Sequence, residues 1–488
     1  MTDHPASSHN PFSAAFEDYT QKRISHWNSV AEKAPSPFYL GGVYARRLSQ
    51  IFRFLIPPDQ RVLELGCGTG RLLASLQPAT GIGVDFSPVM IHQARQQHPH
   101  LKFVQGDAHK LDLGKTEFDY IILSDLLNDV WDIQGLLQQL HPYTHTGTRI
   151  IINHFSHLWQ LPLNLAQKLN LANPNLQQNW ITKEDVSNLL SLAGFQAIRQ
   201  WEEFLLPLPI PLLQSLCNKV LVKLWPFKYL GLANFTIARP SPVKSPSQPS
   251  PRVSIIIPAR NEEGNIHAIF ARVPEMGAST ELVFVEGHSS DNTWEAITRH
   301  IKENPERPSI QIKQQGVGKG DAVRQGIRHA TGDLIMILDA DLTVSPEDLP
   351  LFYRAITSNQ GEFINGSRLV YPMERQAMRF LNMVGNKVFS LLLSWLIGQQ
   401  IKDTLCGTKV FWKHDYDTVA ANRSYFGEFD PFGDFDLIFG FTKINRKIID
   451  IPIRYKERTY GDTNIQRWRH GLLLARMSMV AVNKLKFV

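Results

Sequence analysis

The sequence predicts an α/β fold divided into two domains. Short apolar runs typical of buried strands alternate with amphipathic stretches in both halves of the chain, as in parallel sheets covered by helices. A Pro/Ser-rich segment separates the halves, and 488 residues suffice for two to four domains of about 100–200 residues each. The 43% hydrophobic and 20% charged fractions exclude a largely disordered chain.

Charge and cysteine content restrict the partners and the compartment. A net charge of +6, from 51 Lys and Arg against 45 Asp and Glu, excludes a dedicated nucleic-acid binder and fits an anionic small ligand or membrane surface. Three widely spaced cysteines predict neither a zinc site nor a disulfide framework. The first residues lack a signal-peptide pattern, and no apolar run reaches the ~20 residues of a spanning helix. We therefore expect a cytoplasmic protein, with at most peripheral contact at the inner face of the membrane.

The first predicted domain, 1–238, carries its polar residues at strand ends. Its strands are predicted at 61–65, 81–85, 101–105, 120–123, 148–153 and 235–238. The first strand leads into the motif VLELGCGTG at 62–70, and Asp85, Asp107 and Asp125 follow or end the next three. Glycines at a strand–helix turn let the backbone approach a ligand closely. Carboxylates at neighbouring strand ends suit ribose hydroxyls and an adenine amino group.

Taken alone, this turn fits a plain tight turn or a dinucleotide site. It reads G-x-G-x-G followed by Arg71, and with the strand-end acids it resembles the class I S-adenosylmethionine-dependent methyltransferases, over about 61–239. The resemblance implies a Rossmann-like domain in which the methionine part of the cofactor is framed by Glu64, Gly66, Gly68 and Gly70. Asp85 is then expected at the ribose, and Asp107 and Ala108 at the adenine. Hydride transfer with NAD is the alternative.

The methyl acceptor leaves no clear pattern. A hydroxyl acceptor needs a general base, and the polar residues near the predicted strand ends are Asp125, Asn128, Asp129 and His154, each of which also suits a structural cap. The apolar segment 204–230 is broken by prolines and is predicted as an insertion. It is a lipid-facing surface, an acceptor pocket or a flap packed on its own domain. Residues 26–27 and 38–44 either cover the donor or pack as helices.

Residues 239–252 alternate Pro and Ser without an acidic residue, which predicts an extended, semi-rigid linker. The second predicted domain, 253–488, begins immediately after it. Its strands are predicted at 253–257, 282–286, 310–313, 334–338 and 363–365.

The second domain contains a D-x-D pattern at a strand end. The run LIMILDAD at 334–341 places Asp339 and Asp341 where both carboxylates reach one hard cation, which neutralises a diphosphate. A capped turn is the other explanation of D-x-D. The stretch GKGDAVR at 318–324 puts Lys319 at a helix start, as in phosphate sites.

Further motifs extend this pattern: VSIIIPARNE at 253–262, NGSR at 365–368, KDTLCGTK at 402–409, FDLI at 435–438 and IPIRYKERTYG at 451–461. Together they resemble the family 2 glycosyltransferases of GT-A fold, in particular the dolichol-phosphate-mannose-synthase-like branch, over about 253–466. The resemblance implies an inverting enzyme whose nucleotide-sugar is lined by Pro258, Ala259, Arg260, Asn261, Glu262, Glu286, Lys319, Asp339 and Arg368. It also implies Mg²⁺ or Mn²⁺ on Asp339 and Asp341, with Arg458 facing the phosphates.

Two departures leave the substrates open. VEGHSSD at 285–291 has Gly287 where the family carries a second carboxylate, so the base is uracil or guanine. RTYGDTN at 458–464 lacks the family's lysine, so the acceptor is a polyprenyl phosphate or a glycan hydroxyl. A hydroxyl needs a base, for which Asp403 is favoured over Asp436 because it lies in a polar break between apolar segments; an anionic lipid phosphate needs none.

Two segments near the C-terminus suit a membrane surface. Residues 379–397 predict an amphipathic helix whose stripe is Met383, Val384, Val388, Leu391, Leu392 and Trp395, either at a membrane interface or in the core. Basic and apolar residues alternate over 467–486.

We therefore expect a bifunctional enzyme that transfers a methyl group and a sugar to glycan or lipid-linked acceptors, without a nucleic-acid partner. The alternative is a glycosyltransferase with a non-catalytic S-adenosylmethionine-binding domain.

Overall fold

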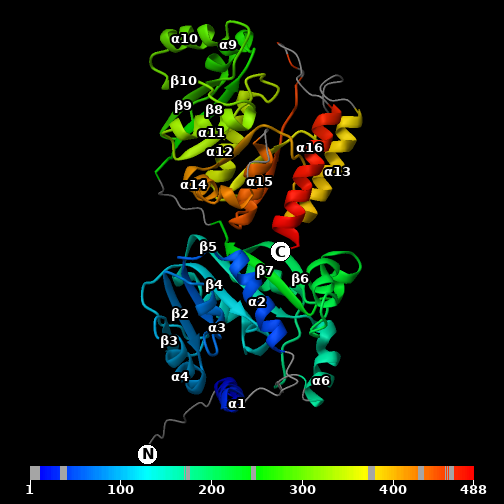
Figure 1. Ribbon diagram of the computed structural model, residues 1–488. Coiled ribbons are helices and arrows are strands. Elements are labelled where there is room, and N and C mark those ends of the chain that lie inside the picture. Colours follow the sequence, from blue (N-terminus) through cyan, green and yellow to red (C-terminus); the bar gives the residue numbers. More distant parts are fainter. Residues whose placement is uncertain are drawn as a thin grey trace, which may run out of the picture. The chain divides into compact units, whose positions relative to one another are not determined.

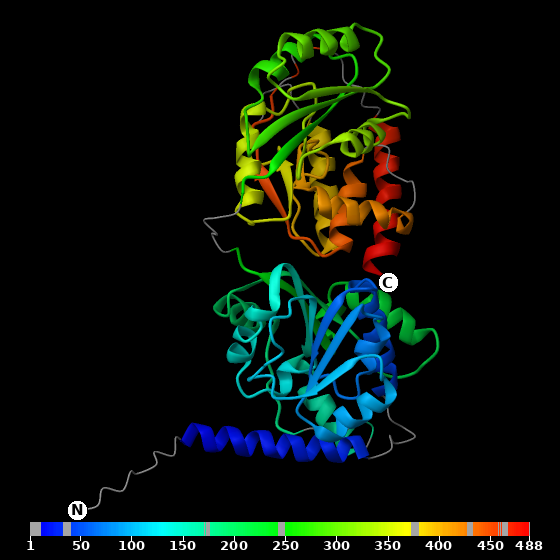
Figure 2. The same ribbon diagram turned by 90° about the vertical axis from the view of Figure 1, so that its left-hand side faces the viewer.

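The computed structural model describes residues 11–32, 41–169, 171, 176–242, 249–371, 380–426, 433–456, 458, 460 and 467–487. The side chains of 11–13, 41, 380–384 and 467–472 lie outside this description. The chain divides into two compact units, 1–241 (with residue 488) and 242–487, each built on a seven-stranded sheet with helices (Figures 1 and 2). The predicted α/β class with two domains is confirmed.

The sheet of the first unit has the strand order β3-β2-β1-β4-β5-β7-β6. Its strands are β1 (Arg61–Leu65), β2 (Thr80–Asp85), β3 (Lys102–Gln105), β4 (Phe118–Ser124), β5 (Thr144–Phe155), β6 (Phe195–Glu203) and β7 (Ala233–Pro240). The first five pair in parallel, while β7 runs antiparallel to both of its neighbours. The carboxyl ends of β1 to β5 therefore share one edge, which gathers the strand-end acids.

Helices cover both faces of this sheet. They are α1 (Pro11–Glu32), α2 (Gly41–Leu55), α3 (Arg71–Ser75), α4 (Pro88–Gln97), α5 (Ile133–Gln138), α6 (Gln160–Lys168), α7 (Lys183–Leu192) and α8 (Leu213–Ser215). Short 3-10 or π turns are η1 (Leu127–Asp129), η2 (His141–Tyr143), η3 (His157–Trp159), η4 (Leu216–Val220), η5 (Leu221–Lys223) and η6 (Phe227–Leu230). Alternate residues of β1, β4 and β5 pack on α2 to α4 and on α5 and α7, which gives two cores.

Two features differ from the sequence prediction. Strand β6 was not predicted, because polar residues occupy about half of FQAIRQWEE and mask its alternation. Strand β7 extends through Arg239 and Pro240, which were assigned to the linker. Arg239 is buried, and its guanidinium donates hydrogen bonds to Gln196 Oε1 on β6, so the sheet retains it. Residues 243–248 of the predicted linker lie outside the described residues.

The sheet of the second unit has the order β10-β9-β8-β11-β13-β12-β14. Its strands are β8 (Arg252–Ala259), β9 (Ser279–Glu286), β10 (Ser309–Lys313), β11 (Leu334–Ile337), β12 (Phe363–Ser367), β13 (Lys409–Trp412) and β14 (Ile448–Pro452). Strand β13 is antiparallel to β11 and β12, and the other pairs are parallel. The carboxyl ends of β8, β9 and β11 therefore meet at one edge.

The helices of this unit are α9 (Glu263–Arg272), α10 (Thr293–Glu303), α11 (Lys319–His329), α12 (Leu349–Thr357), α13 (Phe380–Ile397), α14 (Lys413–Ala421), α15 (Asp434–Lys443) and α16 (Arg467–Ala481). Short turns are η7 (Pro346–Asp348), η8 (Arg423–Tyr425) and η9 (Val482–Lys486). Helices α9, α10 and α12 close a core on one face of the sheet. Helices α13 and α16 lie side by side (Figure 1).

Helix α13 leaves part of the predicted apolar stripe uncovered. Val388, Leu391 and Leu392 are exposed, and the buried apolar residues include Leu393, Leu396 and Ile397 instead. Trp395 lies under the ammonium of Lys486, at 4.9 Å from the ring centroid. Arg379 and the side chains of 383 and 384 lie outside the described residues. In the part of the chain that the structure describes, no helix is long and apolar enough to cross a membrane.

Glu64 on β1 is a carboxylic acid inside the first unit. Its side chain is 2% exposed, and Oε2 accepts a hydrogen bond of 3.1 Å from the N–H of Leu73 in α3. Burial raises the pKa of Glu64 from its ordinary value near 4.5 to about 8, because the charged form loses hydration.

This burial predicts a pH-dependent stability. Between pH 4.5 and pH 8 the unfolded chain releases the Glu64 proton before the folded chain does, so folding stability falls as pH rises through this window. The slope that one such group adds is at most roughly 1.4 kcal/mol per pH unit. We expect Glu64→Gln, which keeps an oxygen acceptor for Leu73, to flatten this fall in denaturant titrations at several pH values. Parallel pH profiles of the variant and the wild type would contradict the assignment.

Candidate active sites

The glycine-rich turn after β1 has the backbone that its sequence requires. Gly66, Gly68 and Gly70 have φ of 71°, 51° and 73°, a region that favours glycine. A Cβ on Gly70 would stand 2.5 Å from the ring of Phe103. Around Gly68, in contrast, no described atom lies within 4 Å of such a Cβ. The turn is thus packed at one end and open at its middle glycine, where a ligand can approach the backbone.

Asp85 at the end of β2 fastens this turn to the start of α4. Its Oδ2 accepts the N–H of Gly68 and its Oδ1 accepts the N–H of Ser87, both at 2.9 Å. Burial raises the pKa of Asp85, although the two N–H groups act to lower it. The structure therefore brings Glu64, the three glycines and Asp85 together at one edge, as the sequence predicted.

Asp107 and Ala108 lie half-buried in the loop after β3, at the same edge. Although burial acts to raise it, hydrogen bonds from His109 hold the pKa of Asp107 below its usual value. Asp107 Oδ1 accepts the backbone N–H of His109 at 2.9 Å and lies 2.7 Å from ring Nδ1. The ring of Phe16 on α1 packs edge-on against that of His109, at 5.3 Å between centroids.

Helix α1 extends across this edge. Asp129 accepts hydrogen bonds of 2.7 Å from Arg23 Nε and from Trp27 Nε1. On the next residue of the helix, Asn28 Oδ1 accepts a hydrogen bond of 2.6 Å from Ser87 Oγ. Trp27 thus fastens α1 to the loop after β4, and its role as a cover over the donor stays a prediction. Asp129, named as a candidate base, anchors this helix.

Asp125 forms a buried polar cluster after β4. Its Oδ1 accepts hydrogen bonds from Tyr44 OH at 2.7 Å and from Asn153 Nδ2 at 2.6 Å, and its backbone has a φ of 54°. Burial raises the pKa of Asp125 to about 7, although the bond from Tyr44 acts to lower it. Tyr44 lies 81 positions away in the sequence, and no local pattern indicated this contact.

The neighbouring polar residues have different roles. Asn128 donates to the backbone oxygen of Asn179 and accepts the N–H of Phe155, so it fastens loops. His154 is buried, and burial lowers its pKa to about 4. Its Nε2 has no hydrogen-bond partner among the described residues. A neutral imidazole with one free nitrogen is a further polar group at the end of β5.

In the second unit, the two acids of D-x-D each face a cation. Asp339 Oδ1 lies 2.5 Å from Lys319 Nζ, at the first residue of α11. Asp341 Oδ2 accepts a hydrogen bond of 2.5 Å from Arg458 Nη2. Although burial acts to raise it, Lys319 holds the pKa of Asp339 below its usual value. The pattern is therefore part of a charge cluster.

Glu262, in the loop after β8, adds a third carboxylate. Its Oε1 lies 3.8 Å from Arg458 Nη1, and burial raises its pKa to about 7. Hard oxygen donors of this kind suit Mg²⁺ or Mn²⁺. Within the described residues, no group of three His, Cys, Asp or Glu stands ready to hold an ion, so Asp339 and Asp341 fit one only with ligand oxygens completing the shell.

The loop 258–262 is tied to the end of β9. Asn261 Oδ1 accepts the N–H of Ser290 at 2.7 Å, and Ser289 donates its own N–H to Glu286 Oε1 at 2.5 Å. Arg260 is exposed. A Cβ on Gly287 would stand 2.9 Å from Gln314 Oε1, so a family-type carboxylate at this position would crowd Gln314.

Arg368 and Asp403 form a buried, bidentate ion pair. Arg368 Nε and Nη2 lie 2.6 and 2.9 Å from the two carboxylate oxygens of Asp403. Asp403 also accepts bonds from the N–H of Arg368, from the N–H of Leu405 and from Asn386 Nδ2. Although burial acts to raise it, Arg368 holds the pKa of Asp403 low. Its assignment as a base stays a prediction.

Loop 402–409 also approaches D-x-D. A Cβ on Gly407 would stand 1.9 Å from Asp339 Oδ2 and 2.4 Å from Lys319 Nζ, so glycine is needed for this close approach. Asp436, the second candidate base, lies in the first turn of α15, 3.2 Å from Arg423 Nε. Burial raises its pKa, although Arg423 and Arg324 act to lower it.

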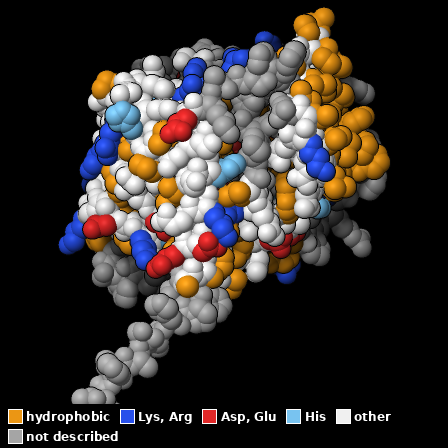
Figure 3. Space-filling view, turned by 90° about the horizontal axis from the view of Figure 1, so that it is seen from below, with side chains coloured by type: hydrophobic (Ala, Val, Ile, Leu, Met, Phe, Trp, Pro, Cys, Tyr) orange, Lys and Arg blue, Asp and Glu red, His pale blue; other side chains and the backbone are white. Residues whose placement is uncertain are grey.

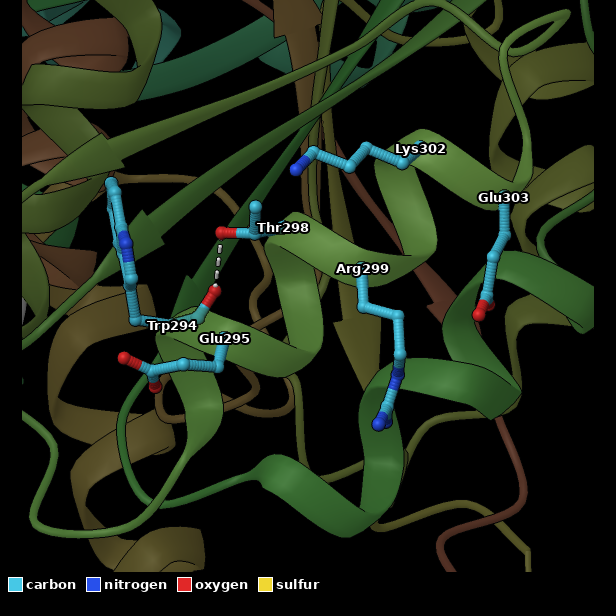
Figure 4. Close-up of a pocket in the computed structure, with 6 residues that line it drawn as sticks. All are labelled: Trp294, Glu295, Thr298, Arg299, Lys302 and Glu303. Atoms are coloured by element: carbon cyan, nitrogen blue, oxygen red, sulfur yellow. Dashed lines mark hydrogen bonds between the residues drawn. The ribbon is translucent and has the colours of Figure 1, made fainter.

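A surface pocket lies elsewhere, along α10. It is lined by Trp294, Glu295, Thr298, Arg299, Lys302 and Glu303, and Thr298 Oγ1 donates to the backbone oxygen of Trp294 (Figure 4). None of the residues predicted for either site lines it.

Comparisons with known proteins match the two units separately. Residues 56–194 match the family model described as a methyltransferase domain, and residues 254–419 match that of glycosyl transferase family 2. Relatives of the second unit include a dolichol-phosphate mannosyltransferase of Pyrococcus furiosus, 27% identical over 44% of this chain and 59% of that protein. Another is an undecaprenyl-phosphate 4-deoxy-4-formamido-L-arabinose transferase of Photorhabdus laumondii, 27% identical over 43% and 62%. The chain thus spans about three fifths of these relatives' length.

Similarity to solved structures is weaker. Glucosyl-3-phosphoglycerate synthase from Mycobacterium tuberculosis is 16% identical, with a TM-score of 0.36. The match covers 49% of this chain and 81% of that protein. The family models match the two units in the order that the motifs predicted. The chain therefore joins a methyltransferase domain to a domain of glycosyl transferase family 2.

Proposed function

We propose that the second unit transfers a sugar, with inversion, from a nucleotide-sugar to a polyprenyl-phosphate acceptor, and that the first unit transfers a methyl group from S-adenosylmethionine. The observation that carries the first part is the charge cluster at the edge shared by β8, β9 and β11. There Asp339 and Asp341 lie against Lys319 and Arg458, and ion pairs of this kind suit a diphosphate with its cation.

Different residues of this cluster would bind different parts of the nucleotide-sugar donor. When bound, Mg²⁺ or Mn²⁺ supplies positive charge to a leaving diphosphate. Asp339 and Asp341 are the residues that would hold it. Lys319 and Arg458, released from the carboxylates, then donate hydrogen bonds to phosphate oxygens. Loop 258–262 and Glu286 support the nucleoside.

The relatives' names and the state of Asp403 favour a lipid phosphate over a glycan hydroxyl. The relatives cited above are named for dolichol-phosphate and undecaprenyl-phosphate. Five hydrogen bonds already reach the carboxylate of Asp403, which leaves it poorly suited to take a substrate proton. An anionic phosphate needs no base. We therefore propose Asp403 as a positioning residue for Arg368, with Asp436 left as the base if the acceptor is a hydroxyl.

For the first unit, Glu64, the open glycine turn, Asp85, Asp107 and Ala108 support a bound S-adenosylmethionine. Asp125, whose pKa burial raises to about 7, is then a candidate to take a proton from a methyl acceptor. If this unit transfers methyl groups, S-adenosylhomocysteine accumulates when the chain is incubated with S-adenosylmethionine and a suitable acceptor. If it is a non-catalytic binding domain, no S-adenosylhomocysteine accumulates with any candidate acceptor.

We place the protein in the cytoplasm, at the inner face of the membrane where polyprenyl phosphates are reached. The support on the second unit is the exposed part of α13, Val388, Leu391 and Leu392.

Asp85→Ala tests the donor site of the first unit. Hydrogen bonds from a carboxylate to ribose hydroxyls contribute roughly 1.5–3 kcal/mol, so calorimetry should show an affinity for S-adenosylmethionine about one to two decades weaker. Glycosyl transfer should be unchanged. Asp119→Ala, which removes a carboxylate paired with Arg61 at the other end of the strands, is the matched control and should bind normally. Wild-type affinity in Asp85→Ala would remove this residue from the site.

Asp339→Asn and Asp341→Asn test the second unit. Each should lower sugar transfer at least about a hundredfold, because a cation at a developing charge contributes several kcal/mol to the barrier reduction. A chelator should do the same to the wild type, with recovery on adding Mn²⁺. Full transfer in the presence of EDTA would instead assign the D-x-D pattern to a turn cap.

Gly407→Ala separates the geometry of the cluster from its charges. The atoms nearest to the added methyl group belong to the side chains of Asp339 and Lys319, so we expect it to move these two charged groups first. A melting curve checks that the variant is folded. Sugar transfer should fall about a hundredfold, as expected for groups moved by about 1 Å. Gly385→Ala in α13, where no described atom lies within 4 Å of the new Cβ, is the control and should keep full activity. Equal activity in both variants would contradict the close packing of loop 402–409 on Asp339.

A further inference from the structure

The first unit exposes a large apolar surface, which we call the apolar cap. It consists of exposed side chains from the α6 region and from segment 204–230: Leu158, Leu161, Leu165, Leu169, Leu208, Ile210, Leu212, Leu213, Leu216, Trp225, Phe227, Tyr229 and Leu230. Hydrophobic side chains are gathered in this way on one side of the space-filling view (Figure 3). Exposed patches of this extent are uncommon on soluble proteins and mark interaction surfaces.

Helix α6 and the η3 turn before it are together apolar on two faces. Trp159 and Leu163 pack against the core of the unit, and Trp159 Nε1 donates a hydrogen bond of 2.8 Å to the backbone oxygen of Leu230. This bond joins the two parts of the cap. On the outer face, Leu161, Leu165 and Leu169 recur every four residues, and Leu161 is 79% exposed. A helix that is apolar on both faces needs a second apolar environment.

Segment 204–230 is held in place by polar contacts inside it. Buried Asn218 accepts the N–H groups of Leu205 and Leu206 and donates to the backbone oxygen of Leu206. Lys223 forms a buried ion pair with Glu203 at the end of β6. Within this fixed segment five leucines are exposed, at positions 208, 212, 213, 216 and 230, and Trp225 is 77% exposed.

The cap lies at the edge of the sheet where the carboxyl ends of β1 to β5 meet, which we call the reacting edge. Helix α6 follows the end of β5, and segment 204–230 connects the end of β6 to the start of β7. Ala233 pairs with both Phe155 and Glu203, so these strand ends share one edge. Asp125 follows β4 at that same edge.

The charge of the cap is entirely positive. The chain has 45 acidic residues, yet none occurs in 151–183 or in 204–261. Lys168 and Lys219 are exposed beside the leucines, and Lys228 Nζ lies 4.8 Å from the ring of Tyr229. Aromatic and aliphatic side chains bordered by lysines are typical of surfaces that enter the headgroup region of anionic membranes.

We propose that the apolar cap docks the first unit on the surface of an anionic lipid bilayer. The leucines and Trp225 enter the headgroup boundary, and Lys168, Lys219 and Lys228 face the lipid phosphates. A second copy of the chain is a poorer occupant, because a two-fold interface sets the same patch against itself and brings like charges together. Docking places the reacting edge next to the headgroups, where an amphipathic methyl acceptor is reached; only this last step rests on the proposed methyl transfer.

The test is co-sedimentation of the full chain with vesicles, without S-adenosylmethionine or sugar donor. We expect binding to equimolar phosphatidylcholine and phosphatidylglycerol, weaker binding to phosphatidylcholine alone, and a decrease with salt, since surface charges are screened over about 8 Å at physiological ionic strength. Leu161→Asp and Trp225→Asp should each reduce the partition coefficient at least about tenfold. Lys219→Glu should weaken binding mainly at low salt.

Two controls separate this surface from others. Leu192→Asp replaces a leucine that is 57% exposed at the end of α7, before β6 begins, so it lies at the opposite edge and should not affect binding. Leu391→Asp tests the exposed stripe of α13. Unchanged melting curves show that each variant is folded.

Three outcomes would overturn the proposal: no pelleting of the wild type at low salt, loss of binding in Leu391→Asp but not in the cap variants, or a dimer without lipid that Leu161→Asp dissociates. This test measures lipid binding without any turnover. Its outcome therefore stays valid even if the proposed methyl transfer or sugar transfer is disproved.

Discussion

Both units depend on one electrostatic constraint: carboxylates collected at the edge of a parallel sheet have to be neutralised or hydrogen-bonded. Parallel strands bring their carboxyl ends to one side, and the acids that follow them lose water. In the first unit, backbone N–H groups of Gly68 and Ser87 satisfy Asp85. In the second, the side chains of Lys319 and Arg458 neutralise the D-x-D acids. The same topology is thus balanced by different donors.

This difference matches the ligands proposed for each unit. Backbone donors leave Asp85 partly desolvated, with its pKa raised, beside an open glycine where a neutral sugar hydroxyl can approach. Basic side chains instead form a set of charges that a diphosphate and a cation can exchange with the acids. Asp403 is likewise neutralised by a basic side chain, since the guanidinium of Arg368 binds both of its carboxylate oxygens.

The edge that holds the carboxyl ends of β1 to β5 in the first unit is bounded by two elements of opposite character. Helix α1 brings polar and aromatic contacts, through Trp27 to Asp129 and Phe16 to His109. The apolar cap brings leucines and lysines beside the ends of β5 and β6. In the proposed reaction, a polar methyl donor would thus lie on the side of α1 and a lipid-associated acceptor on the side of the apolar cap.

The sequence alone determined the α/β class, the two families and the strand-end acids, because a strand, a glycine turn and the acid after it are local patterns read over a few residues. It missed three strands: β6, whose polar residues hide its alternation, β13, whose four residues are too short to stand out, and the five-residue β14. Only the tertiary structure decided which partner each acid has. Tyr44 reaches Asp125 across 81 positions, and Arg368 reaches Asp403 across 35. Such contacts depend on how helices and loops pack onto the sheet. Burial and the charged or hydrogen-bonding partners that together shift the pKa of these acids exist only after that packing.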